Sequence, residues 1–342
     1  MSNQADLKDQ FEVLIEPAKD VTNVIVNEKE NGNLQLKFTP KVPGAYSIEV
    51  KINGDKLPTC PFTVQVKERE LVVVGELDLK FFPGDVPRRL YGIAVNTEGK
   101  IVVADYTGHS VYVLDRDGNC LRKLGGKGTN SGQFNYPAGV SFLDDNEILI
   151  ADEENHRIQQ INIQTGTVVK SFGKRGVGKR EFMNPVDVCL DDKGRIVVTE
   201  CCGHRIQVLS RDGETISMFG DRDPEKLLHP MSCIPYKNRF FVTDSGNDCI
   251  KVCDQSGTFF YKFGKQGNQD GQFYALRGVL LDSFNNLLVC DMNNNRVQQF
   301  SLDGRFIGKT ITGLLSPFRI AAAPDGRILV TSLTATKIYL LK

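Results

Sequence analysis

Short apolar runs separated by turn residues fill the chain from residue 71 to its end. The runs are rich in β-branched residues and are bounded by Gly, Asn or Asp, a pattern typical of β-strands. One phrase recurs: a Pro or its substitute, a strand, a turn, a strand that ends in an acid, and a polar loop that ends in a basic residue. Its clearest copies are ILIADEENHRIQQI, IVVTECCGHRIQVL and LLVCDMNNNRVQQF. The pattern predicts a repeat protein built from strands.

The acid that ends the second strand of the phrase marks the period of the repeat. We call these positions the anchors. The six anchors are Asp105, Asp152, Glu200, Asp244, Asp291 and Ser332. They recur about every 40–50 residues, which is the period of propeller blades. Because each copy holds enough apolar runs for four strands, here called a to d in chain order, the sequence predicts an all-β, six-bladed β-propeller over residues 71–342.

The two ends of this region are expected to complete one blade together. The sixth copy ends with KIYLLK, its strand c, and an orphan strand, LVVVG, lies upstream of the first copy. We therefore expect Leu71–Val74 to supply the missing strand d, which removes an exposed sheet edge. Glycines in the connections from strand d to the next strand a permit the turns between blades. Phe134, Phe182 and Phe273 in these connections are expected to fill the space between neighbouring blades.

The motifs resemble those of a known family. Asn155-His156-Arg157-Ile158-Gln159 is similar to the signature of NHL repeats. Upstream, LQLKFTPKVPGAYSIEVKINGDKLPTCPFTVQV resembles the second half of a filamin-type immunoglobulin repeat, and FEVLIEP fits a middle strand of it. The resemblance implies that residues 1–67 form a partial filamin-type β-sandwich without about the first two strands of a complete repeat, which leaves a sheet edge exposed.

A filamin-type repeat followed by NHL repeats is the order found at the C-terminus of TRIM-NHL proteins. The resemblance implies recognition of RNA in some members and of protein partners in others. Ubiquitin-ligase activity in that family comes from RING and B-box zinc clusters, and the 342 residues contain no such Cys/His cluster. We therefore expect a recognition module without enzymatic activity. Two alternatives stay open: a scaffold that recruits only proteins for a ligase, and a propeller hydrolase or lyase with a central metal.

Composition narrows the class of protein and its location. The 42 basic and 42 acidic residues balance, so nucleic-acid binding requires a local basic patch. The nine cysteines include no Cys-x-x-Cys pair, which favours reduced thiols in an intracellular protein. No signal peptide or membrane-length apolar run is present, so we expect a cytoplasmic chain that is monomeric and does not bind membranes.

Two sets of repeat residues invite a metal-site interpretation. His109, His156 and His204 share one repeat position, and three histidines are a common ligand set for a metal. The anchor acids could likewise line a cation site. Each of three anchors is followed five residues later by an arginine: Arg157, Arg205 and Arg296. We expect the histidines and anchors to be structural, with the arginines tying the loops by charge-assisted hydrogen bonds, and we expect no metal or other cofactor.

The ligand is expected on the face formed by the b–c loops and the d–a connections, called the top face. Its charge, counted along the connections, is slightly more positive than that of the opposite face. Residues just after the start of strand a should surround the channel mouth. The expected contacts with RNA, single-stranded or hairpin, or with a protein are inner residues Arg277, Arg319, Tyr91 and Phe318, and outer residues Lys174, Arg175, Lys179 and Arg180. Alternatively, the four inner residues only cover the core and have a purely structural role.

Overall fold

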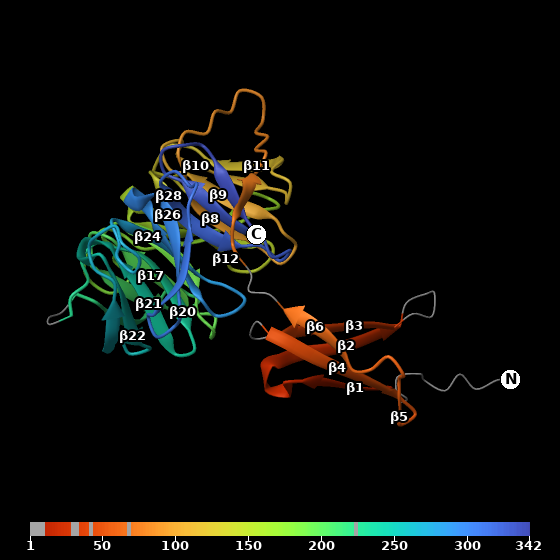
Figure 1. Ribbon diagram of the computed structural model, residues 1–342. Coiled ribbons are helices and arrows are strands. Elements are labelled where there is room, and N and C mark those ends of the chain that lie inside the picture. The colour runs from red at the N-terminus through yellow and green to blue at the C-terminus, as the bar shows by residue number, and fades with distance from the viewer. Residues whose placement is uncertain (1–10, 29–33, 41–43, 67–69, 222–224) are drawn as a thin grey trace. The chain divides into compact units, whose positions relative to one another are not determined.

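The computed structural model describes residues 11–28, 34–40, 44–66, 70–221 and 225–342 (Figure 1). The chain divides into two compact units, Met1–Glu70 and Leu71–Lys342, and each is described by itself. Regular structure in the described ranges consists of β-strands and short 3₁₀ turns, which confirms the predicted all-β class. No helix in these ranges is long and apolar enough to cross a membrane.

The N-terminal unit contains two antiparallel sheets. In the larger sheet β4 (Gly44–Ile52) lies between β1 (Phe11–Glu16) on one side and β5 (Asp55–Lys56) and β6 (Phe62–Val66) on the other. The smaller sheet pairs β2 (Val21–Glu28) with β3 (Leu34–Pro40), and a 3₁₀ turn, η2 (Ala18–Asp20), links β1 to β2.

The core of this unit is small. Among the residues of this unit whose burial the structure describes, Ile15, Tyr46 and Ile48 are the buried hydrophobic ones, and alternate residues of β4 supply two of them. This alternation is what a strand with one buried face produces.

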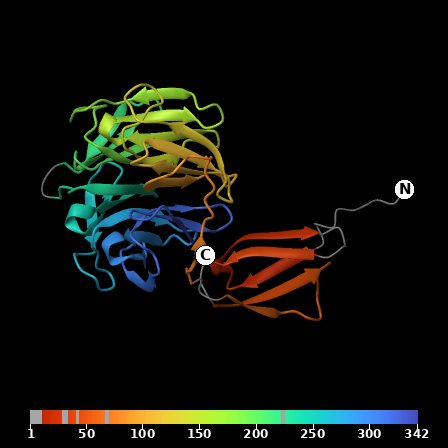
Figure 2. The same cartoon turned by 90° about the horizontal axis from the view of Figure 1, so that it is seen from above.

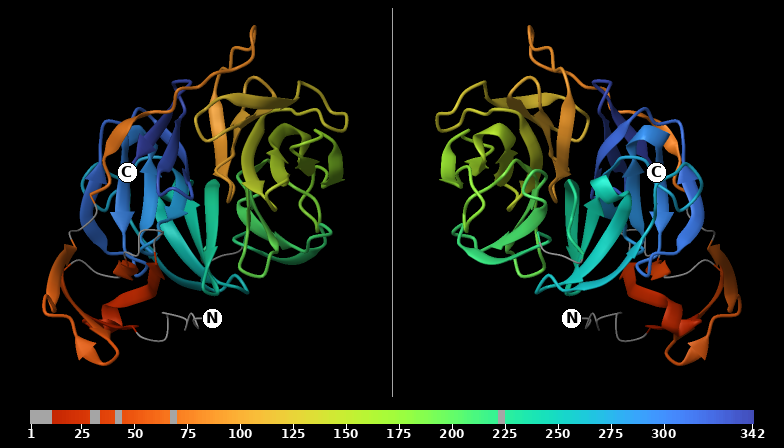
Figure 3. Two further views of the ribbon diagram at one scale, coloured as in Figure 1. Left: turned by 90° about the vertical axis from the view of Figure 1, so that its right-hand side faces the viewer. Right: turned by 90° about the vertical axis from the view of Figure 1, so that its left-hand side faces the viewer.

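The second unit is a ring of four-stranded antiparallel sheets, seen as the round body in Figures 2 and 3. Five blades follow the chain in order: β8–β11 (Leu90–Val95, Ile101–Asp105, Ser110–Leu114, Cys120–Gly125), β12–β15 (Pro137–Phe142, Glu147–Asp152, Arg157–Asn162, Val168–Phe172), β16–β19 (Pro185–Leu190, Ile196–Glu200, Arg205–Leu209, Thr215–Phe219), β20–β23 (Pro230–Tyr236, Arg239–Asp244, Cys249–Asp254, Phe259–Phe263) and β24–β27 (Leu276–Leu281, Leu287–Asp291, Arg296–Phe300, Phe306–Ile311). The first strands of adjacent blades contact one another around the axis. Three b–c loops begin with a 3₁₀ turn: η3 (Glu153–Asn155), η4 (Ser245–Asn247) and η5 (Met292–Asn294).

The sixth blade joins both ends of the propeller. Its strands are β28 (Pro317–Ala322), β29 (Ile328–Ser332), β30 (Ile338–Leu341) and β7 (Val73–Glu76). β7 runs antiparallel to β30, with Leu340 opposite Gly75. The predicted closure is confirmed, and the strand begins two residues later than Leu71. Leu71 itself is buried in the core of this blade.

Phenylalanines of the d–a connections fill the space between blades, as predicted. Phe134, Phe182 and Phe273 are fully buried. Phe134 packs with Leu124 of the first blade and Ile148 of the second. The preceding glycine is required here: Gly125 has φ +83°, and a Cβ on it would lie 2.2 Å from the Phe134 ring.

Candidate recognition surface on the propeller

The anchor acids are buried below the top-face connections and form hydrogen bonds with their backbone. Asp105, Asp152, Glu200, Asp244 and Asp291 are all at most 1% exposed. Each carboxylate accepts a backbone N–H from the residues just before strand a of its own blade, as Asp152 does from Asn135 at 2.7 Å. Ser332, the sixth anchor, donates instead to the Leu315 carbonyl at 2.6 Å. The anchors therefore act inside the blade rather than on its surface.

The arginines five residues after three anchors complete the same network. Nε of Arg157, Arg205 and Arg296 donates to the anchor carboxylate at 2.7, 2.7 and 2.8 Å. The terminal nitrogens of Arg157 donate to three carbonyls of the preceding d–a connection, at 2.8–2.9 Å. In the fourth blade, Lys251 takes this role and lies 3.1 Å from Asp244. These charge-assisted bonds fix the backbone of the top face.

The three repeat histidines join neighbouring blades. Nδ1 of His109, His156 and His204 accepts the backbone N–H of Tyr136, Asn184 and His229 at 3.1, 3.2 and 3.0 Å. All three have φ +52°. Asp248 and Asn295 make the equivalent bond in the next two blades. Because Nδ1 accepts this hydrogen bond, its lone pair is not free to bind a metal. Among the described residues, no group of three or more His, Cys, Asp or Glu residues could hold a metal ion.

This hydrogen bond predicts a pH-dependent stability. Burial, the largest cause, lowers the pKa of each of the three histidines. A folded-state pKa below the unfolded value of about 6.5 means that the unfolded chain binds more protons, so stability is lost as pH falls below about 6.5. We expect the melting temperature to fall between pH 7.5 and pH 5.5. The triple variant His109→Asn/His156→Asn/His204→Asn keeps the acceptor found at Asn295 and should show a flatter profile. An equally steep profile in this variant would contradict the assignment.

A group of tyrosines lies at the centre of the top face. The rings of Tyr91 and Tyr106 stack with their centroids 4.0 Å apart and an interplanar angle of 13°. The ring centroid of Tyr136 lies 4.8 Å from that of Tyr106. All three are partly exposed. Beside them, burial raises the pKa of Glu153 to about 7, while a hydrogen bond with Tyr106 acts in the opposite direction. Tyr106, Tyr136 and Glu153 were missed by the sequence analysis, although Tyr106 and Glu153 directly follow anchors and could have been found from that register.

Two inner residues predicted to contact the ligand are instead buried. Phe318 is 1% exposed and Arg319 is 4% exposed. Nη2 of Arg319 donates to the Val186 carbonyl at 2.8 Å, and Nη1 lies 3.7 Å from Asp187. These partners belong to the third blade, so Arg319 of the sixth blade spans the axis. The prediction that Phe318 and Arg319 present their side chains to a ligand is wrong, because side chains from opposing first strands fill the narrow centre of the ring.

The other predicted inner residues remain at the surface in part. The ring centroids of Tyr91 and Phe318 lie 4.1 Å apart, and Tyr91 is partly exposed. Arg277 is partly exposed and donates from Nη1 to the Ser245 hydroxyl at 2.7 Å. The structure thus separates a buried pair, Phe318 and Arg319, from an accessible pair, Tyr91 and Arg277.

The predicted outer residues form an exposed basic loop between the second and third blades. Lys174 and Arg180 have acidic partners, Glu181 at 3.3 Å and Glu214 at 2.6 Å. Arg175 and Lys179 are exposed and have no ion-pair partner within 4 Å among the described residues. Val177, in the same loop, is 73% exposed.

Further cations lie on equivalent connections, and the sequence analysis missed them. Lys127 has the same register as Arg175, because each forms a parallel bridge to the inter-blade phenylalanine. Exposed basic residues of these connections also include Arg88, Arg89, Lys226 and Lys265. Five anchor acids are buried, as are their partners Arg205 and Arg296, whereas these cations of the connections are exposed.

Comparisons with known proteins match this architecture. The filamin/ABP280 repeat matches residues 2–63, the NHL repeat matches residues 134–161 and 182–209, and a six-bladed β-propeller family, DUF5128, matches residues 226–326. Protein lin-41 of Caenorhabditis elegans is 31% identical over 117 residues, which are 32% of this chain and 10% of that protein. Protein brain tumor of Drosophila melanogaster is 37% identical over 89 residues, 24% of this chain and 9% of that protein.

A third relative carries an enzymatic name. E3 ubiquitin-protein ligase TRIM71 of Bos taurus is 30% identical over 107 residues, 30% of this chain and 12% of that protein. The matches therefore span only about a tenth of the length of these curated relatives.

Solved structures show the same fold at low sequence identity. A structural genomics protein of unknown function from Bacteroides thetaiotaomicron aligns with a TM-score of 0.66 and 14% identity, covering 98% of this chain and 91% of that one. A streptogramin B lyase aligns with a TM-score of 0.54 and 16% identity, covering 78% and 96%. At such identities the likeness concerns the fold and not the chemistry. By its family matches, the chain carries a filamin-type repeat followed by NHL repeats in a six-bladed propeller, and the relatives with which it shares parts of its sequence are TRIM-NHL proteins.

Proposed function

We propose that the module is a non-enzymatic RNA-binding unit whose top face takes single-stranded RNA or the loop of a hairpin. The observation that carries the proposal is the contiguous, partly exposed group Tyr91, Tyr106 and Tyr136 with exposed cations on the connections around it. Aromatic rings stack with unpaired bases, and Lys and Arg side chains neutralise the phosphates between them.

The rigidity of the surface supports the same function. The anchor networks and inter-blade hydrogen bonds hold the loops that present the tyrosines and cations. A preorganised surface loses less conformational entropy on binding than a mobile one. The cations Lys127, Arg175 and Lys179 lie in loops of this kind and are available for phosphates.

A protein-recruiting scaffold is the second candidate. The balanced charge of the whole chain and the exposed Val177 within the basic loop favour a protein partner on the same face. One relative is named an E3 ubiquitin-protein ligase, and a propeller that recruits a substrate would suit such a protein. Salt dependence separates the candidates, because phosphate contacts release counterions and few protein contacts do so to the same extent.

We expect the intact chain to bind an unstructured uridine-rich RNA with an affinity that falls steeply as salt increases. The variant Lys127→Ala/Arg175→Ala/Lys179→Ala should lower the slope of log affinity against log salt by about 2, since each phosphate contact on a single strand contributes about 0.7. Fluorescence anisotropy at several salt concentrations measures this slope.

The control removes two exposed cations from the opposite face, Arg116→Ala/Lys237→Ala. It should leave both the affinity and the slope nearly unchanged. Equal losses in the two variants would show that the top face is not the binding surface. Absence of salt-dependent RNA binding by the intact chain would favour the protein-recruiting scaffold.

A further inference from the structure

The first blade departs from the repeat around its anchor acid. In the second blade, the residues three, five and seven positions after the anchor are Asn155, Arg157 and Gln159. Their side chains all donate to Asp152, at 2.8, 2.7 and 3.1 Å. In the third and fifth blades, arginine and glutamine at the same positions donate to Glu200 and Asp291. The site around each of these acids is filled by the blade itself.

The same three positions in the first blade are Gly108, Ser110 and Tyr112. None of them brings a cation to the anchor. The Asp105 carboxylate accepts three backbone N–H groups, from Arg88, Arg89 and Gly108, at 3.0–3.1 Å. Among the described residues no side-chain cation forms an ion pair with it within 4 Å. Asp105 is nevertheless 1% exposed, so a buried carboxylate is left without the cation that its counterparts have.

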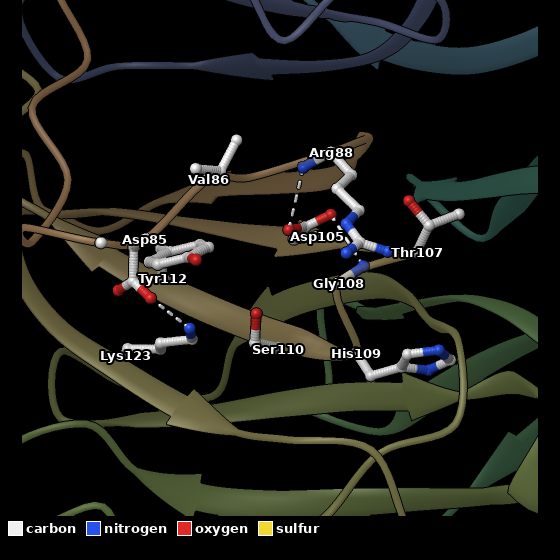
Figure 4. A pocket seen from close by; sticks show the side chains of 11 residues that line it. Asp85, Val86, Arg88, Asp105, Thr107, Gly108, His109, Ser110, Tyr112 and Lys123 are labelled. Carbon is white, nitrogen blue, oxygen red and sulfur yellow. Dashed lines mark hydrogen bonds and ion pairs between the residues drawn. The ribbon is translucent and has the colours of Figure 1, made fainter.

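A cavity of about 520 Å³ occupies the place of the missing side chains (Figure 4). Asp105, Ser110 and Tyr112 line it, together with Arg88 and the Asp85–Lys123 ion pair. Ser110 is 1% exposed, and its hydroxyl oxygen has no hydrogen-bond partner among the residues that the structure describes. The cavity therefore contains a buried acceptor and an unpartnered hydroxyl, and it is open to solvent.

The fourth blade shows that the loss of arginine opens the cavity. It has Cys249 at the arginine position, and a second cavity of about 450 Å³ is lined by this cysteine. There, however, Lys251 enters from the glutamine position and lies 3.1 Å from Asp244. Each of the two blades has a cavity at this position. They differ because a side chain of the same blade forms an ion pair with Asp244 in the fourth blade, whereas no described side chain does so with Asp105 in the first. The cavity of the first blade is the one that favours an external cation.

We propose that the first-blade cavity is a receptor for the guanidinium group of an arginine side chain presented by a protein partner. The guanidinium would lie where those of Arg157, Arg205 and Arg296 lie in their own blades, with Nε toward the anchor acid. The guanidinium is a planar group with five donors, so it can bind a carboxylate and nearby carbonyls at the same time. The compact ammonium of lysine fits this arrangement less well. Arg88 and Asn135 occupy equivalent positions, because each donates its backbone N–H to the anchor acid of its blade. Val86 is therefore equivalent to Gln133, whose carbonyl accepts a hydrogen bond from Arg157. This site adjoins the tyrosine group through His109, whose ring centroid lies 4.6 Å from that of Tyr136, and the proposal does not depend on RNA binding.

The test uses the full chain and a small probe, N-acetyl-arginine N-methylamide, with the citrulline analogue as the uncharged isostere. Chemical-shift changes of the Gly108 and Ser110 amides report binding. We expect saturable shifts with the arginine probe and binding by the citrulline analogue weaker by about tenfold or more, because the charged pair is lost. Asp105→Asn should abolish the shifts.

Ser110→Arg is the decisive variant, because it restores the arginine of the other blades. It should block the probe and raise the melting temperature, since the buried carboxylate gains its cation. The control Ser141→Arg places the same side chain on a different strand and should do neither. Probe binding that survives Ser110→Arg, or equal binding of the citrulline analogue, would overturn the proposal. If Asp105→Asn does not fold, the Ser110→Arg result alone decides.

Discussion

A chain from which residues 71–75 are deleted should no longer form a stable monomeric propeller. The deletion removes most of β7 and leaves β30 as an unpaired edge. It also removes the buried Leu71 and the partly buried Val73 from the last blade, and full burial of one such side chain contributes about 1.5–3 kcal/mol. Domains are stable by only about 5–15 kcal/mol, so we expect unfolding or association through the open edge. Thermal melting and sedimentation measure the two outcomes.

Point variants in the same strand provide the control. Leu71→Ala should cost about 2–4 kcal/mol, because it empties a buried position. Val72→Ala and Val74→Ala should cost much less, since these side chains are 49% and 54% exposed. A deletion variant with unchanged melting temperature and monomeric state would contradict the closure that the structure shows.

Removal of Arg205 should be among the most damaging single substitutions in the propeller. Arg205 is 3% exposed and donates from Nε to the fully buried Glu200 at 2.7 Å. Arg205→Ala leaves an uncompensated buried carboxylate, a change that costs about 3–5 kcal/mol. Burial already raises the pKa of Glu200, and the arginine counteracts this shift. Without the arginine, Glu200 should be protonated in the fold at a higher pH, so the loss should be smaller at pH 5 than at pH 8.

An exposed ion pair provides the comparison. Arg305 and Asp303 lie 2.9 Å apart, with 79% and 62% of their side chains exposed. Arg305→Ala should change the free energy of unfolding by less than about 1 kcal/mol. Chemical denaturation of both variants at the two pH values measures the difference. Equal, small losses for Arg205→Ala and Arg305→Ala would mean that the anchor networks do not support the top face.

The blades and their closure could be predicted from the sequence because each depends on local pattern. The anchor acids recur with the strands that they end, and β-branched runs between Gly and Asn turns indicate strands. The orphan strand at Leu71 could be assigned because one blade lacked a strand. The roles of Arg157, Arg205 and Arg296 followed from their fixed distance to an acid, and the structure places each of them on that acid.

The centre of the top face could not be predicted in the same way. Whether Phe318 and Arg319 reach solvent depends on six first strands that converge from distant parts of the chain, and no local pattern carries this information. The stack of Tyr91, Tyr106 and Tyr136 likewise joins two blades. The cavity beside Asp105 accompanies the replacement of asparagine and arginine by the smaller Gly108 and Ser110, and it becomes visible when the first blade is compared with its neighbours in space.

Photocrosslinking of a 4-thiouridine-labelled RNA to the intact chain, followed by peptide mapping, tests the central claim most directly. Stacked bases lie within reach of the rings beneath them, so the crosslinks should concentrate on Tyr91, Tyr106 and Tyr136 and on the connections that carry Lys127 and Arg175. Tyr106→Leu should weaken binding, since one base stack on an aromatic ring contributes about 1–3 kcal/mol. Crosslinks on the a–b and c–d turns of the opposite face, or crosslinks that do not change in the Tyr106→Leu variant, would contradict the account.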